Sequence, residues 1–185
     1  MYRLVIALLC LAAAGGLGYA ALSERWLENP KPSRRVAFSL LSSKICVGEP
    51  ANASCESKSN SELMTELEMQ NDKDSSMAFA RAGQGTLGLS LLSALMLLLC
   101  AGWLVARKRT SGPNGPQHLA LVALMLDLIA ATVFVKTKPG GSTGVGAGPG
   151  FYVFIVACVV GIFAAQLATK LIKPLDPDPA LDPSL

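Results

Sequence analysis

Four long apolar blocks dominate the hydrophobic pattern of this chain. They cover residues 2–22, 83–106, 119–135 and 151–171, and the first three together carry only two charged side chains, Arg3 and Asp127. A helix that rises ~1.5 Å per residue needs ~20 apolar residues to cross ~30 Å of hydrocarbon. Because a backbone in lipid must satisfy its own hydrogen bonds, the blocks predict four transmembrane helices.

Composition supports the same class of protein. Of the 185 residues, 51% are hydrophobic and 16% are charged, which is unlike an average soluble domain. The first block also has the basic start and small-residue end of a secretory signal peptide. Its apolar run is longer than a usual signal core, so we expect it to be retained as a membrane helix.

The distribution of Lys and Arg predicts the orientation. The 107–118 connection carries Arg107, Lys108 and Arg109 without an acidic residue. Arg3, Lys170 and Lys173 fall on the same side of a four-helix chain, and the positive-inside rule makes that side cytoplasmic. Both termini are therefore expected inside, in a plasma or bacterial inner membrane. The predicted exterior segments are the long loop 23–82 and the Gly-rich loop 136–150, and the Pro-rich tail 172–185 is expected to be disordered and cytoplasmic.

The exterior loop contains the cysteine pair Cys46 and Cys55. A structural zinc site normally needs four Cys or His ligands, and the one histidine, His118, falls on the other side of the membrane. Thiol-exchange centres usually have a C-x-x-C spacing. Since disulfides persist outside the cytoplasm, the sequence predicts a structural disulfide between these residues.

The rest of this loop predicts a small sheet and a helix. The segment 36–47 is rich in strand-forming residues, and Pro50 and Asn52 indicate a turn after it. In "SNSELMTELEMQ" three apolar side chains share one helical face, and Asn60 or Ser61 is available as an N-cap. The predicted fold is an all-α membrane protein, a bundle of four transmembrane helices with a small disulfide-stapled sheet in its first exterior loop.

In this arrangement Trp26 lies upstream of the pair Cys46 and Cys55, and Arg81 lies just before the second membrane helix. The arrangement resembles the claudin and PMP22-like superfamily of four-helix membrane proteins. The resemblance implies a four-helix fold with a sheet above the membrane. It also implies that the exterior sheet contacts neighbouring copies or partner membrane proteins and that it holds no active site.

Asp127 lies in the middle of its apolar block, where an ionised side chain costs ~2.5–3.5 kcal/mol. One interpretation is an interhelical hydrogen-bonding group, and the other is an ion or proton site of a transporter. Its candidate hydrogen-bond partners are Ser90, Ser93, Thr132 and Gln166.

The segment "GQGTLG" at Gly83, Gly85 and Gly88 matches a dinucleotide-binding pattern, but no strand precedes it. It opens a membrane helix, where small residues permit close packing.

The sequence therefore predicts a non-enzymatic membrane interaction protein, an accessory or assembly subunit or one that self-assembles through its exterior loop. The alternative is a small transporter or channel subunit that uses Asp127. The expected partners are the lipid bilayer and other membrane subunits or a second copy. No catalytic set, cofactor site, metal site or nucleic-acid partner is indicated.

Overall fold

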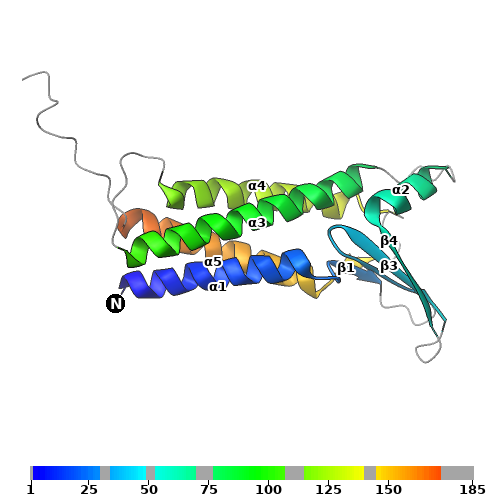
Figure 1. Cartoon of the computed structure of the whole chain (residues 1–185), viewed down its shortest axis with the longest axis horizontal. Helices are drawn as coiled ribbons and strands as arrows, with labels where there is room; N and C mark the ends of the chain where they lie inside the picture. The colour runs from blue at the N-terminus through cyan, green and yellow to red at the C-terminus, as the bar shows by residue number, and fades with distance from the viewer. Residues whose placement is uncertain are drawn as a thin grey trace, which may run out of the picture.

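Four long helices run side by side in the computed structural model, and a small sheet stands at one end of them (Figure 1). The structure describes residues 2–29, 34–48, 53–69, 77–106, 115–139 and 145–171. All four helices are long and apolar enough to cross a membrane, as the sequence predicts. They are α1 (Tyr2–Leu22), α3 (Met77–Val105), α4 (Pro116–Lys136) and α5 (Pro149–Leu171).

The longest of them, α3, begins at Met77, ahead of the apolar block that starts at Gly83. Its first turns rise beside the sheet, so the ring of Phe79 stacks on Phe134 of α4 at a centroid distance of 4.5 Å and meets Phe38 of the sheet edge-on at 5.5 Å. The helix thus ties the bundle to the sheet above it.

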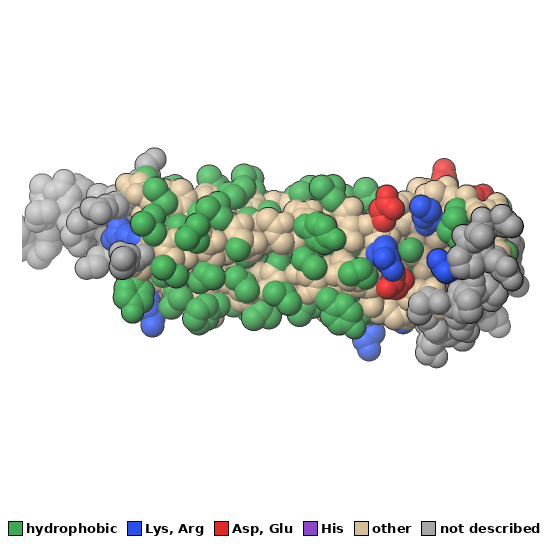
Figure 2. Space-filling model, turned by 90° about the horizontal axis from the view of Figure 1, so that it is seen from below, with side chains coloured by type: hydrophobic (Ala, Val, Ile, Leu, Met, Phe, Trp, Pro, Cys, Tyr) green, Lys and Arg blue, Asp and Glu red, His purple; other side chains and the backbone are tan. Residues whose placement is uncertain are grey.

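The bundle keeps small side chains inside and large apolar side chains outside. Its buried positions are mostly Ala, Gly, Ser and Cys, and Gly16 of α1 lies so close to α5 that an added Cβ would stand 2.9 Å from the Ala157 Cβ. Large apolar side chains such as Leu8, Leu95 and Val156 point outward and cover the length of the bundle (Figure 2). Close packing on small residues beneath an apolar surface is typical of helices that associate in lipid.

The sheet has five antiparallel strands in the order β4-β3-β2-β1-β5. The strands are β1 (Leu27–Asn29), β2 (Arg34–Phe38), β3 (Ser42–Val47), β4 (Ser54–Ser59) and β5 (Gly146–Ala147). The strand-prone segment 36–47 contributes to two strands because the chain turns at Ser39, whose hydroxyl accepts hydrogen bonds from the N–H groups of Leu41 and Ser42.

The last strand, β5, comes from the loop between α4 and α5, for which the sequence predicted no strand. Backbone hydrogen bonds from Gly148 N–H to the Trp26 carbonyl and from Gly150 N–H to the Arg25 carbonyl hold this loop against the start of β1. The loops α1–α3 and α4–α5 therefore build one sheet.

The helix α2 (Asn60–Met69) follows β4 directly, as the apolar periodicity predicts. Its N-cap, however, is neither of the two expected residues. The Ser59 hydroxyl accepts the N–H of Glu62, and the Glu62 carboxylate accepts the N–H of Ser59, which together form a capping box. The side chain of Asn60 instead donates to the carbonyls of Ser39 and Leu40 and fixes α2 to the β2–β3 turn.

Several predicted features lie outside the described residues. They are the basic cluster Arg107–Arg109, the tail 172–185, the turn at Pro50 and Asn52, and residues 140–144 of the Gly-rich loop.

Candidate interaction surface

A single tryptophan fixes the sheet on the bundle. Trp26 is completely buried just before β1, and its indole N–H donates to the Ala20 carbonyl at the end of α1. Its ring contacts three aromatic rings of α4 and α5, at centroid distances of 5.0 Å to Phe154, 6.0 Å to Phe134 and 6.1 Å to Phe151. The sheet is therefore held rigidly above the helices.

The alternation of side chains gives the sheet one apolar face and one polar face. On one face Leu27 lies opposite Phe38 in the neighbouring strand, and both are buried against the bundle. On the other face two cross-strand rows carry the polar groups and the cysteine pair. These rows are Glu28–Ala37–Lys44–Ser57 and Arg35–Cys46–Cys55. The second face points away from the helices.

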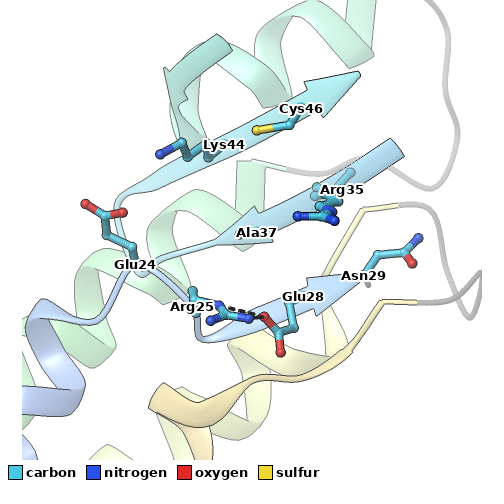
Figure 3. Close-up of a pocket in the computed structure, with 9 residues that line it drawn as sticks. Glu24, Arg25, Glu28, Asn29, Arg35, Ala37, Lys44 and Cys46 are labelled. Carbon is cyan, nitrogen blue, oxygen red and sulfur yellow. Dashed lines mark hydrogen bonds and ion pairs between the residues drawn. The ribbon is translucent and has the colours of Figure 1, made fainter. Parts of the chain in front are cut away.

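This polar face is hollowed into a groove of about 460 Å³ (Figure 3). Its lining includes Glu24, Arg25, Glu28, Arg35 and Lys44. Arg25 and Glu28 form an ion pair at 2.6 Å. By contrast, Glu24, Arg35 and Lys44 form no ion pair with any described residue. The groove thus presents two cations and one carboxylate to whatever meets the face.

The cysteine pair crosses from β3 to β4 on the same face. Cys46 and Cys55 are directly opposed in the register, and their sulfur atoms are 2.04 Å apart, at disulfide-bonding distance. The hairpin between them therefore closes on itself beside the groove. The remaining cysteines, Cys10, Cys100 and Cys158, are buried in the bundle, where Cys10 and Cys100 meet across α1 and α3.

Asp127 is completely buried in the middle of α4. Two of its four expected partners are excluded, because Thr132 and Gln166 are exposed and the Thr132 hydroxyl donates to the Leu128 carbonyl of its own helix. Ser90 and Ser93 face the interior from α3, with the Ser90 hydroxyl beside the carboxyl. Among the described residues, however, neither Asp127 oxygen and neither hydroxyl has a hydrogen-bond partner in the required geometry.

Arg81 does not belong to the groove on the sheet. It is exposed near the start of α3 and lines a separate hollow of about 560 Å³ beside α4, together with Glu68 at the end of α2. Two of the residues that carry the family resemblance therefore have different surroundings. Trp26 is buried between sheet and bundle, and Arg81 is on the surface.

The glycine pattern of α3 has a structural role at one position only. An added Cβ on Gly83 would overlap the Leu40 carbonyl of the β2–β3 turn, whereas one on Gly85 or Gly88 would meet nothing within 4 Å. The close approach that Gly83 permits is to the β2–β3 turn of the sheet and to the Phe134 ring of the neighbouring helix α4.

The groove residues Glu24, Arg35 and Lys44 were not predicted from the sequence. A signal was present, because Arg35 and Lys44 alternate with the apolar residues Val36 and Ile45, and this period of two places both cations on one face of a sheet. The pairing of β2 with β3 was needed to show that the two rows are neighbours.

Among the described residues, no three His, Cys, Asp or Glu side chains are grouped so that they could hold a metal ion. No protein-family model matches the chain, and no curated protein matches it. Membership of the claudin-like superfamily accordingly stays a prediction from the residues.

Proposed function

We propose that this chain is a multi-pass membrane interaction protein of claudin-like architecture, which joins a larger membrane assembly through the polar face of its exterior sheet. The observation that carries the proposal is the charged groove on a sheet that Trp26 fixes rigidly above four apolar helices. A rigid surface whose charges have no ion-pair partner among the described residues suits partner recognition, because complementary charges set specificity and speed association.

The orientation in the membrane is part of this proposal. Arg3 and Lys170 lie at the end of the bundle opposite the sheet, where the Arg3 guanidinium donates to the Leu171 carbonyl. The positive-inside rule favours that end as cytoplasmic. The sheet and the cysteine pair would then lie outside, where a disulfide persists.

Charge reversal in the groove tests the proposed function. Arg35→Glu and Lys44→Glu replace two groove cations by carboxylates, and like charges across an interface cost several kcal/mol. We expect the tagged protein, purified in mild detergent, to lose the membrane proteins that co-purify with the wild type. Lys136→Glu is the matched control, because Lys136 is exposed at the same end of the bundle but does not line the groove. Partner recovery that is unchanged in both groove variants would contradict the proposal.

A second candidate function rests on Asp127, because a buried carboxyl without a hydrogen-bond partner in the described structure is suited to carry a proton or cation. Reconstituted liposomes with a pH-sensitive dye separate the two functions. The interaction protein shows no flux, whereas a transporter shows a flux that Asp127→Asn abolishes without disturbing the fold.

A further inference from the structure

The hollow that Arg81 lines combines a charged part with an apolar wall. It has a volume of about 560 Å³ and lies where the end of α2 meets the first turns of α3 and the last turns of α4 (Figure 1). Glu68 and Arg81 supply its charged groups. The rest of the lining is apolar and mostly small, and consists of Met77, Ala78, Ala82, Gly85, Ala130 and Val133. A hollow of this composition suits an amphipathic ligand.

The hollow lies at the level where the apolar surface of the bundle begins. On α3 the apolar block starts at Gly83, just after Arg81. On α4 the exposed side chain of Val133 comes shortly before Lys136, the first charged residue after the apolar block. In four helices that cross a membrane, this level is the boundary between acyl chains and headgroups, where an arginine extends its charged group toward the polar side.

The two charged groups of the hollow are of opposite sign, and they are not paired with each other. Arg81 and Glu68 are exposed, and neither forms an ion pair with any described residue. One carboxylate oxygen of Glu68 accepts the Met77 N–H at 3.2 Å, which holds this side chain at the start of α3. A guanidinium binds a phosphate through two parallel hydrogen bonds, and a carboxylate binds an ammonium group. Together they match a headgroup that carries both a phosphate and an amine.

Gly85 leaves room for an acyl chain beneath this headgroup. Gly85 follows Arg81 by one helical turn and lies on the same face of α3. It is exposed, and an added Cβ would meet nothing within 4 Å. An acyl chain gains only van der Waals contact here, because it leaves one apolar environment for another. The charged groups therefore decide which lipid binds.

We propose that this hollow binds one zwitterionic phospholipid from the leaflet at the sheet end of the bundle. The Arg81 guanidinium donates to the phosphate, the Glu68 carboxylate accepts from the amine, and an acyl chain lies over Gly85 between α3 and α4. The inference goes beyond the proposed interaction function and uses none of the groove residues. A headgroup bound in this way links the end of α2 to the start of α3.

Headgroup selectivity tests the charged part of the site. The full chain, purified and delipidated in detergent, is titrated with phosphatidylethanolamine or with phosphatidylglycerol of the same acyl chains, and native mass spectrometry counts the bound lipids. The two lipids share the phosphate, but only the first has an amine. The wild type should bind phosphatidylethanolamine about tenfold more tightly, as expected for one charge-assisted hydrogen bond.

Two variants separate the two charges. Glu68→Gln should remove the preference for the amine, because it deletes the carboxylate that attracts the ammonium and repels the anionic lipid. Arg81→Gln should weaken the binding of phosphatidylethanolamine about tenfold, through loss of the phosphate contact. Lys136→Gln is the matched control, because Lys136 is exposed at the same end of the bundle but does not line the hollow, and it should bind both lipids as the wild type does. Equal binding of the two lipids by the wild type would overturn the proposal.

Filling the hollow tests the place of the acyl chain. Gly85→Leu puts a side chain into the open space without a clash inside the protein, so it should weaken phosphatidylethanolamine binding while Glu68 and Arg81 stay in place. Gly102→Leu is the matched control, since Gly102 is equally open at the other end of α3. If Gly85→Leu binds the lipid as well as Gly102→Leu does, the site is refuted. The proposed function is tested separately by Arg35→Glu and Lys44→Glu, so failure of the one is distinguishable from failure of the other.

Discussion

Replacing Gly83 by alanine tests how the sheet is seated on the bundle. The new Cβ would overlap the Leu40 carbonyl oxygen and would lie 3.1 Å from both the Leu40 carbonyl carbon and the Phe134 ring, inside the 3.4 Å at which ordinary contact begins. Leu40 belongs to the backbone of the β2–β3 turn, so the clash cannot be relieved by rotating a side chain.

The magnitude follows from three contributions. Overpacking a filled contact costs ~1–3 kcal/mol. Displacing the Leu40 carbonyl also disturbs its hydrogen bond from the Asn60 amide, worth ~1 kcal/mol. Alanine recovers ~0.5–1 kcal/mol through its better helix propensity. We therefore expect Gly83→Ala to lower the free energy of unfolding by ~1–3.5 kcal/mol.

Thermal unfolding in detergent, followed by tryptophan fluorescence, measures this effect. At ~2–4 °C per kcal/mol for a chain of this size, Gly83→Ala should unfold ~2–14 °C below the wild type. Gly85→Ala and Gly88→Ala are matched controls in the same helix, because an added Cβ meets nothing there. They should unfold at or slightly above the wild-type temperature. If Gly83→Ala behaves like these controls, the close approach of the turn to α3 is not real.

Three further predictions concern the sheet and its supports. Trp26→Ala should lower the free energy of unfolding by ~3–5 kcal/mol, because it empties the site between α4 and α5. Trp26→Phe should lower it much less in the same assay, because the Ala20 carbonyl keeps its hydrogen bond from the Ser23 N–H. Asn60→Ala removes the two side-chain hydrogen bonds to the β2–β3 turn and keeps the backbone bond to the Leu41 carbonyl, so hydrogen exchange at that turn should quicken while exchange in the bundle does not change. Hydrogen bonds from the Ser59 N–H and hydroxyl lower the pKa of the Glu62 carboxyl. The ionised carboxylate should therefore stabilise the start of α2 at pH values above the usual carboxyl pKa of ~4.3. This stabilisation should be lost as the pH falls through the lowered pKa of Glu62. Circular dichroism during acid titration should show this loss in the wild type and not in Glu62→Gln.

Local patterns predicted most of the elements. The apolar blocks predicted the four long helices, and Leu63 and Met64 predicted the buried face of α2. The capping box was also written in the sequence, as Ser59 followed three residues later by Glu62, but the competing caps Asn60 and Ser61 stood beside it. A local signal can be misread when several residues offer the same hydrogen bond.

The candidate surface depended on contacts between distant segments. Trp26 could be recognised in the sequence, but its role requires rings from α4 and α5, more than a hundred residues further along the chain. The surroundings of Asp127 are likewise a tertiary result, because the exposed positions of Thr132 and Gln166 depend on how the helices rotate about their axes.

The sequence by itself determined the class of elements, because the length and periodicity of apolar runs are set by the thickness of lipid and the geometry of single helices and strands. It also determined that Cys46 and Cys55 could bond, since a short hairpin brings them together. Only the tertiary structure decided that β5 completes the sheet, that Gly83 alone of its motif is required, and that β4 is an outer strand of the sheet. These features depend on which strands become neighbours, and strand pairing between distant segments leaves no periodic trace in either one.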